Sequence, residues 1–324
     1  MVMFKGKNFL VAGGAGFIGA NLIKRLLDLD ANVRATLHDK PAVIVDKKVE
    51  YLKCDLVRMD DCKKAVSGMD YVFMCAANTS GAAVMAATPL VHVTPNVVMN
   101  AQILEAAYFA GIKKFIWISS SVVYPPSAEV KVREDMMMLN KDPYDTYFGA
   151  AWMKRYTEIL CRLYSEKLNK TMPTVVVRPS NIYGTYDKFD PATSHVMAAT
   201  IRKVVERQAP IKIWGTGNDV RDLIYIDDFI SGLLLAAEKI NTYDPINIAS
   251  GKGYSIKEIL KIALEIDGYE DAKIEYDTSK PSMIPIRLFD TKKAEQLLGF
   301  KVKFDLREGI EKTIQWYKET LRSA

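Results

Sequence analysis

Short β-branched runs alternate with amphipathic stretches through the first half of the chain. Strands and helices repeat their apolar residues with different periods, so the runs predict strands and the stretches predict helices. The predicted strands are 8–12, 33–37, 70–76, 114–119 and 174–178, and the predicted helices are 18–28, 95–110 and 149–168. Strands that alternate with helices form a parallel sheet with helices on both faces. We therefore predict an α/β fold built on a doubly wound, Rossmann-type parallel sheet.

The pattern changes after residue 178, where a loop rich in Gly, Tyr, Asp and Pro begins. Helices are predicted near 194–206, 226–238, 256–266 and 306–321, with short strands at 211–214 and 246–249. Such a region is typical of a smaller lobe laid against the edge of a sheet. We predict a first domain over 1–178 and a smaller C-terminal lobe over 179–324, with parts of 211–250 returning to the first domain.

Composition and charge narrow the classes of function. Of the 324 residues, 49% are hydrophobic and 26% are charged, as in an ordinary folded protein. The 44 Lys and Arg against 39 Asp and Glu give a net charge of +5, which is too dispersed for a nucleic-acid footprint but suits a small anionic ligand. The four cysteines lack metal-ligand spacing, so we expect no metal, reduced thiols and a cytoplasmic location. No apolar stretch is long enough to predict a membrane span.

A glycine-rich turn lies directly after the first predicted strand and directly before the first predicted helix. Glycines at this position let the backbone approach a pyrophosphate, which then lies over the positive end of the helix. The last glycine allows close packing of the helix on the strand. We predict a dinucleotide site here and a substrate-binding role for the smaller lobe. The predicted cofactor residues of the turn are Gly13, Gly16, Phe17, Ile18 and Gly19.

The spacing of three between these glycines resembles the extended branch of the short-chain dehydrogenase/reductase superfamily, which acts on nucleotide sugars. The resemblance implies a bound NAD or NADP. It puts the adenine against Asp55 and Leu56, and places Ala76 and Ala77 after the fourth strand, with Asn96 in the following helix.

The choice between NAD and NADP depends on the end of the second strand. The acidic residue that binds the ribose hydroxyls in this family falls here on Leu37. His38 then stands where NADP-dependent relatives carry an Arg for the 2′-phosphate, although Asp39 lies beside it. A surface His on a loop is the alternative reading. We predict a preference for NADP.

Catalytic residues in this family are a Ser or Thr and a Tyr-x-x-x-Lys motif. The resemblance puts the Ser at Ser120, whose hydroxyl would hydrogen-bond the reacting oxygen of the substrate. It puts the Lys at Lys154, which would lower the pKa of the Tyr and hold the nicotinamide ribose. The residue four positions before this Lys is Ala150, so the Tyr is missing.

Two explanations of Ala150 remain open. One is an engineered change from Tyr to Ala, which would stop turnover. The other is a natural departure in which Tyr147 supplies the phenol. Because Tyr147 lies nearly two turns before Lys154, its phenol would be displaced by ~4–5 Å from the usual place.

The segments 178–196 and 214–228 most resemble the GDP-L-fucose synthases of this family. Dehydratases of the family need an acidic pair at the positions that Ser121 and Val122 occupy, which disfavours dehydration. The Cys and His that the resemblance assigns to epimerisation are here Val122 and Tyr186, so we expect no double epimerisation. Hydride transfer at carbon 4 of a hexose or heptose survives, in a 4-dehydrogenase or 4-ketoreductase. A 4-epimerase and a catalytically silent binding protein are the alternatives.

The resemblance also implies substrate residues and a partner. Two guanidinium groups, Arg221 and Arg287, would bind the diphosphate, although Arg221 next to Asp222 also suits a local ion pair. A homodimer is expected, through a four-helix bundle of the helices near 96–111 and 149–168. The full set of predicted substrate residues is Thr79, Ser121, Asn181, His195, Trp214, Arg221 and Arg287.

Overall fold

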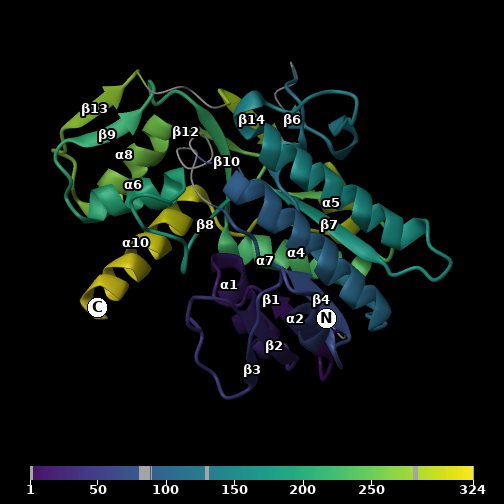
Figure 1. Cartoon of the computed structure of the whole chain (residues 1–324). Coiled ribbons are helices and arrows are strands. Elements are labelled where there is room, and N and C mark those ends of the chain that lie inside the picture. Colours follow the sequence, from purple (N-terminus) through teal and green to yellow (C-terminus); the bar gives the residue numbers. More distant parts are fainter. Residues whose placement is uncertain (1–2, 80–87, 89, 128–130, 280–283, 324) are drawn as a thin grey trace.

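A computed structural model of the chain describes residues 3–79, 88, 90–127, 131–279 and 284–323. Its main sheet has seven parallel strands in the order β11-β7-β5-β4-β1-β2-β3 (Figure 1). The strand order reverses between β1 and β4, which defines a doubly wound sheet and confirms the predicted fold. The strands are β1 (Asn8–Ala12), β2 (Asn32–Leu37), β3 (Val49–Lys53), β4 (Tyr71–Met74), β5 (Lys114–Ile118), β7 (Thr174–Pro179) and β11 (Ile246–Ile248).

Helices cover both faces of this sheet, because its strands are apolar on both sides. In β1, Phe9 and Val11 face one core, which includes α1 and α7, while Leu10 and Ala12 face a second core, which includes α2, α4 and α5. The helices are α1 (Phe17–Asp28), α2 (Met59–Val66), α4 (Leu90–Phe109), α5 (Phe148–Glu166) and α7 (Ile226–Lys239). Among the described residues, no helix combines the length and apolarity that crossing a bilayer requires.

The smaller lobe contains a second sheet. Its order is β12-β10-β14-β6, and β8 also pairs with β10. A separate parallel pair joins β9 to β13, and α6, α8 and α10 pack against one another beside these strands (Figure 1). The elements are β6 (Lys131–Val132), β8 (Asn181–Tyr183), β9 (Ile211–Trp214), β10 (Val220–Tyr225), β12 (Gly253–Ser255), β13 (Ile274–Asp277), β14 (Ile286–Phe289), α6 (Val196–Val205), α8 (Ile256–Asp267), α9 (Lys292–Leu298) and α10 (Leu306–Ser323).

The chain crosses between the two sheets in both directions. Strand β6 lies before residue 178 in the sequence but belongs to the second sheet, whereas β11 lies after it and pairs with β7 in the main sheet. The division at residue 178 into a cofactor domain and a substrate lobe stays a prediction.

Two helix boundaries differ from the expected ones in an informative way. Helix α5 begins one residue before the predicted start, but α4 begins at Leu90, five residues before its predicted start, with Pro95 inside it. A proline removes one backbone donor and does not prevent the turn before it from being helical. The Nδ2 of Asn96 donates to the carbonyl of His92 at 2.7 Å, which uses one of the acceptors of this turn.

Candidate functional site

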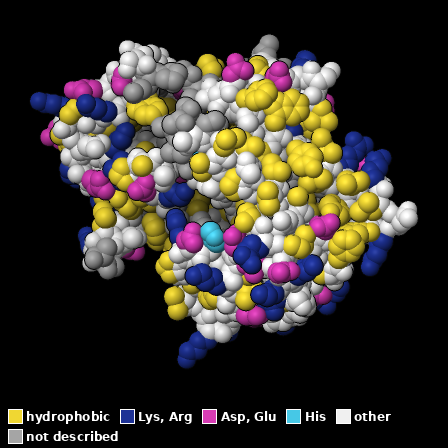
Figure 2. All heavy atoms as spheres, in the orientation of Figure 1, with side chains coloured by type: hydrophobic (Ala, Val, Ile, Leu, Met, Phe, Trp, Pro, Cys, Tyr) yellow, Lys and Arg dark blue, Asp and Glu magenta, His cyan; other side chains and the backbone are white. Residues whose placement is uncertain are grey.

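A cleft of about 2010 Å³ opens between the two sheets, at the carboxyl ends of the main-sheet strands. Open α/β sheets bind ligands at this edge, where the strand order reverses. Figure 2 shows the hollow between the two parts of the molecule, with basic, acidic and His side chains beside it. Residues of both parts line the cleft, from the glycine turn after β1 to α10.

The glycine turn is shaped by close backbone approaches. Gly13 has φ +91°, and a Cβ there would lie 2.7 Å from the backbone of Ala76. A Cβ on Gly19 would lie 2.2 Å from the carbonyl oxygen of Gly13, so α1 reaches the turn only because residue 19 has no side chain. Gly13, Gly16, Phe17 and Ile18 line the cleft, and Gly19 packs behind them. The turn leaves room for a pyrophosphate against the start of α1.

His38 lies between two carboxylates at the end of β2. Its Nδ1 is 3.0 Å from Asp39 Oδ2, and its Nε2 is 3.9 Å from Asp55 Oδ1. His38, Asp55 and Leu56 line the same end of the cleft, and Ala76 and Ala77 line it after β4. A 2′-phosphate placed here would meet two negative charges beside the imidazole.

Asn96 is buried and does not line the cleft. Its Oδ1 accepts a hydrogen bond from the backbone N–H of Asn78 at 2.9 Å, and its Nδ2 donates to the Asn78 carbonyl at 2.9 Å. The two bonds hold the loop after β4 in place. Asn96 therefore positions Asn78 and the adjoining Thr79, both of which line the cleft.

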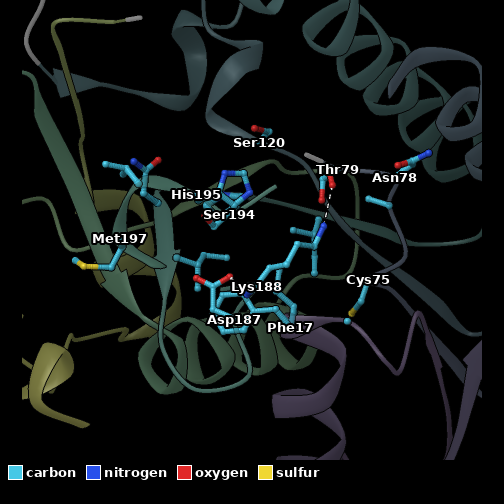
Figure 3. A pocket seen from close by; sticks show the side chains of 18 of the residues that line it. Phe17, Cys75, Asn78, Thr79, Ser120, Asp187, Lys188, Ser194, His195 and Met197 are labelled. Atoms are coloured by element: carbon cyan, nitrogen blue, oxygen red, sulfur yellow. Dashed lines mark hydrogen bonds between the residues drawn. The ribbon is translucent and has the colours of Figure 1, made fainter. Parts of the chain in front are cut away.

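Ser120 follows β5 and lines the cleft (Figure 3). Its Oγ accepts the backbone N–H of Val122 at 3.4 Å, as the cap of the 3-10 turn Ser121–Val123. Because this bond uses only a lone pair of the oxygen, the hydroxyl can still donate its proton to a substrate oxygen.

Lys154 projects from α5 into the same part of the cleft. Its amine donates to the carbonyl of Ile118 at 2.9 Å and lies 4.6 Å from the ring centroid of Trp117. Burial lowers the pKa of Lys154 to about 8, although the carboxylate of Glu158 acts in the opposite direction. A cation of low pKa beside Ser120 suits the transfer of a proton near neutral pH.

Ala150 lies one helical turn before Lys154 and does not line the cleft, whereas Tyr147 does. Burial raises the pKa of the Tyr147 phenol, and the nearby guanidinium groups of Arg221 and Arg287 lower it. The side chain at position 150 has no group that can exchange a proton. Tyr147 supplies a phenol to the cleft that Lys154 also lines, and this phenol lies near the guanidinium groups of Arg221 and Arg287.

A buried polar network behind this wall was not predicted from the sequence. Arg178 Nη2 lies 2.6 Å from Glu158 Oε2, and the Oγ of Ser119 donates to Glu158 Oε1 at 2.6 Å. Arg178 also donates to the Tyr124 hydroxyl at 3.2 Å, and that hydroxyl donates to Asn247 Oδ1 at 2.5 Å. The available signal was an acidic residue four positions after Lys154 on one helix face. The network joins α5 to β5, β7 and β11 directly beneath the cleft.

Arg221 and Arg287 are register partners on the neighbouring strands β10 and β14 of the second sheet. Arg221 Nη2 lies 3.0 Å from Asp219 Oδ2, and Arg221 Nη1 donates to the carbonyl of Ile284 at 2.6 Å. The Arg287 guanidinium lies 4.8 Å from the ring centroid of Tyr144. The ion-pair partner of Arg221 is thus Asp219 and not the adjacent Asp222, and both arginines line the cleft.

The remaining predicted substrate residues lie at three places around the cleft. Asn181 begins β8, and Trp214, at the end of β9, is 51% exposed. His195 caps the start of α6, where burial in the cleft and the charge of Lys188 lower its pKa. In the part of the chain that the structure describes, no three His, Cys, Asp or Glu side chains group so that they could hold a metal ion.

Two further cleft residues, Asp187 and Lys188, had no predicted role. Burial raises the pKa of Asp187 to about 7. The amine of Lys188 donates to the carbonyl of Thr79 at 3.0 Å, a bond that crosses from the loop after β8 to the loop after β4 (Figure 3).

Residues 9–249 match the family described as NAD dependent epimerase/dehydratase. The chain belongs to this family. The chain is therefore an NAD(P)-dependent enzyme by family, as the sequence resemblance predicted.

Individual relatives share about a quarter of their residues with this chain. "Probable GDP-L-fucose synthase 1" of Oryza sativa subsp. japonica is 27% identical, over 99% of this chain and 94% of the relative. A dTDP-4-dehydro-6-deoxy-D-allose reductase of a Streptomyces species is 27% identical, over 97% of each chain. The solved UDP-glucose 4-epimerase of Thermotoga maritima with UDP-glucose has a TM-score of 0.86 at 25% identity, covering 97% of this chain and 99% of that one. The relatives are thus epimerases and reductases of nucleotide sugars.

Proposed function

We propose that this protein is a nucleotide-sugar oxidoreductase that transfers a hydride between carbon 4 of a hexose or heptose and a nicotinamide, as a 4-dehydrogenase or 4-ketoreductase. The observation that carries the proposal is one cleft with Ser120 and Lys154 on one wall and two in-register arginines on the other. Arg287 Nη1 donates to the carbonyl of Ser121 at 2.8 Å, so a diphosphate held by the arginines would lie close to Ser120. A GDP-linked sugar is supported by the GDP-L-fucose synthase relatives.

The residues around the glycine turn fit a dinucleotide cofactor. Side chains on Gly13 or Gly19 would collide with the backbone, so the turn keeps open the room that a pyrophosphate needs. When bound, the nicotinamide would supply the hydride acceptor or donor. We infer that residues 1–178 hold this cofactor and that 179–324 mainly hold the sugar nucleotide.

The identity of the cofactor is a separate proposal. His38 suggested NADP from the sequence, but Asp39 and Asp55 flank it within 4.0 Å. Carboxylates accept hydrogen bonds from ribose hydroxyls and repel a 2′-phosphate. We therefore favour NAD, and expect a lower Kd for NADH than for NADPH.

The chain's own groups divide the proton chemistry. Ser120 donates a hydrogen bond to the oxygen on carbon 4, and Lys154 holds a positive charge beside it. At the usual relay position Ala150 can do neither, so turnover depends on Tyr147 or on a water. Val122 carries no proton at the position of the epimerase Cys, so the double epimerisation of fucose synthases is not proposed.

The test is nicotinamide turnover and product analysis over GDP- and UDP-sugars with NAD and NADP. Three chains are compared: the present one, Ala150→Tyr, and Ala150→Phe, which adds the same bulk without a hydroxyl. If the relay is missing, Ala150→Tyr raises kcat by about 10²–10⁴-fold and Ala150→Phe does not. If the present chain is already active and Tyr147→Phe inactivates it, Tyr147 carries the proton.

The same assay separates the alternatives. A 4-epimerase interconverts sugars without net change of nicotinamide absorbance, and a silent binding protein changes neither. Absence of both signals in all variants, with intact binding of nucleotide sugar, would refute the oxidoreductase and leave the binder.

We also propose a homodimer formed through α4 and α5, and a cytoplasmic location. Figure 2 shows hydrophobic side chains gathered over these two helices, and all four cysteines are free thiols. Light scattering should give twice the chain mass, and Ile159→Glu should halve it; cell fractionation checks the location. The exposed apolar residues of the two helices are Leu90, Val91, Phe109, Phe148, Tyr156, Ile159 and Leu163.

A further inference from the structure

The loop after β8 is tied to the start of α1 by hydrogen bonds of the Asn21 side chain. The Nδ2 of Asn21 donates to the carbonyl of Phe17 at 2.9 Å and to the carbonyl of Thr185 at 2.9 Å. The hydroxyl of Thr185 in turn donates to Asn21 Oδ1 at 3.2 Å. One amide thus bonds both carbonyls, so residue 185 lies beside the first turn of α1, next to the glycine turn.

The next residue turns the backbone. Tyr186 has φ +66°, a left-handed conformation that residues with a Cβ rarely adopt. Its ring packs 5.1 Å from that of Trp316 on α10. Backbone strain of this kind is concentrated at binding and catalytic sites, where the surrounding structure holds it. Both Asp187 and Lys188, which follow the turn, line the cleft.

Lys188 then extends across the cleft. In Figure 3 its side chain passes Phe17 and reaches the carbonyl of Thr79, to which the amine donates at 3.0 Å. Thr79 belongs to the loop after β4, the strand that pairs with β1. The Asn21–Thr185 bonds thus hold the start of this loop beside the first turn of α1, and the Thr79 bond holds the amine of Lys188 at the loop after β4.

The groups around this amine are a neutral carbonyl, a second cation and two carboxylates of its own loop. The partner of the amine is a neutral carbonyl. The acidic neighbours Asp187 and Asp190 accept hydrogen bonds from their own loop. Asp187 Oδ1 accepts from the backbone N–H of Lys188 at 2.6 Å, and Asp190 Oδ1 accepts from the backbone N–H of Ala192 at 3.0 Å. Burial and the positive charge of Lys40, from the loop after β2, lower the pKa of Lys188, and the smaller effects of the Asp187 and Asp190 carboxylates raise it.

We propose that Lys188 is a cofactor-binding residue supplied by the second part of the chain, whose amine holds the diphosphate of the dinucleotide against the glycine turn and the start of α1. This inference rests on the cofactor placement proposed above. On binding, the amine exchanges the Thr79 carbonyl for a phosphate oxygen, which is a stronger, charge-assisted acceptor. The cofactor then joins the loop after β8 to the main sheet, so its binding also sets one wall of the sugar site.

The test measures binding by the whole chain, without turnover. Dissociation constants are determined for NADH, for ADP-ribose, which keeps the diphosphate but lacks nicotinamide, for adenosine, which has no phosphate, and for GDP-mannose. Lys188→Met removes the charge and keeps an unbranched chain, and Lys188→Arg restores a charge. Lys203→Met is the matched control, because Lys203 also lines the cleft but comes from α6.

Lys188→Met is expected to raise Kd about tenfold for both NADH and ADP-ribose, with adenosine unchanged. Lys188→Arg should recover most of this loss, and Lys203→Met should show none. The proposal is overturned if Lys188→Met leaves NADH affinity unchanged, weakens adenosine equally, or weakens GDP-mannose alone, which would place Lys188 in the sugar site. If the present chain binds neither NADH nor NADPH, the proposed function fails as well.

Discussion

The two walls of the cleft are built in different ways. On the first wall the functional groups follow strand ends directly: Gly13 comes right after β1, and Ser120 two residues after β5. On the second wall Lys188, Arg221 and Arg287 come from three separate segments and meet only because β10 pairs with β14 and the loop after β8 is tied to α1. The first wall is a property of local sequence, and the second is a property of tertiary pairing.

The supports behind the two walls differ as well. Behind the first wall, the Glu158 and Arg178 side chains are 0% and 2% exposed and share two hydrogen bonds. On the second wall, Arg221 and Asp219 form an ion pair at 15% and 24% exposure. A buried, fully bonded pair holds a fixed geometry, whereas a partly hydrated pair can reorganise around a ligand. The comparison suggests a rigid catalytic wall and an adjustable substrate wall.

The variant Glu158→Gln is the strongest test of the rigidity of the first wall. Removing one partner leaves the Arg178 charge buried and unpaired, which should cost about 3–5 kcal/mol in free energy of unfolding. Urea denaturation measures it. Glu265→Gln is the control, because Glu265 pairs with Arg307 at 35% and 56% exposure and should cost below about 1 kcal/mol. Equal losses in both variants would contradict a specially rigid first wall.

A second test concerns the adjustable wall. Arg221→Met should weaken GDP binding about 10–100-fold, because a charge-assisted bond is lost, while NADH affinity stays the same. Isothermal titration of both ligands checks the split. Arg322→Met, in the exposed last turn of α10, should change neither affinity. A parallel loss of NADH affinity in Arg221→Met would show that the two walls are not independent.

The same difference explains what could be predicted from the sequence. The alternation of strands and helices predicted the sheet, because most of its strands are apolar on both faces and most of the helices that cover it are amphipathic. Strand β3 and helix α2 were missed. Strand β3 lies at the sheet edge, and its exposed Glu50 and Lys53 interrupt the continuous apolar run that marked the other strands. Helix α2 has only eight residues.

Pairing between distant segments could not be predicted from local sequence patterns. The register that brings Arg221 beside Arg287 joins residues far apart in sequence, and each was proposed for the diphosphate only through the family resemblance. Nothing near Lys188 marks it, because its place depends on the Asn21–Thr185 bonds between α1 and a loop more than a hundred residues later. Asn96 was recognised from the family motif, but the motif did not predict that its side chain would hydrogen-bond the backbone of Asn78 in the loop after β4.

The smallest expected effect concerns Asp187, a half-buried carboxyl of the adjustable wall. Burial raises its pKa to about 7, so between about pH 4 and 7 the folded chain binds a proton that the unfolded chain releases. The contribution of Asp187 to stability is therefore largest below pH 4 and falls as pH rises toward 7. Asp187→Asn should remove a decline of about 1–2 kcal/mol between pH 5 and 7.5, seen as the difference between the two chains in urea denaturation.

Asp190, in the same loop, is the control for the titration of Asp187. Hydrogen bonds from Thr193 lower its pKa, so it stabilises the fold above the unfolded pKa and loses that contribution as pH falls. Asp190→Asn should therefore leave the interval from pH 5 to 7.5 unchanged and alter only the acid limb. If Asp187→Asn also leaves that interval unchanged, the carboxyl is hydrated in solution, and the loop that carries Lys188 is more open than its Asn21 and Thr79 contacts require.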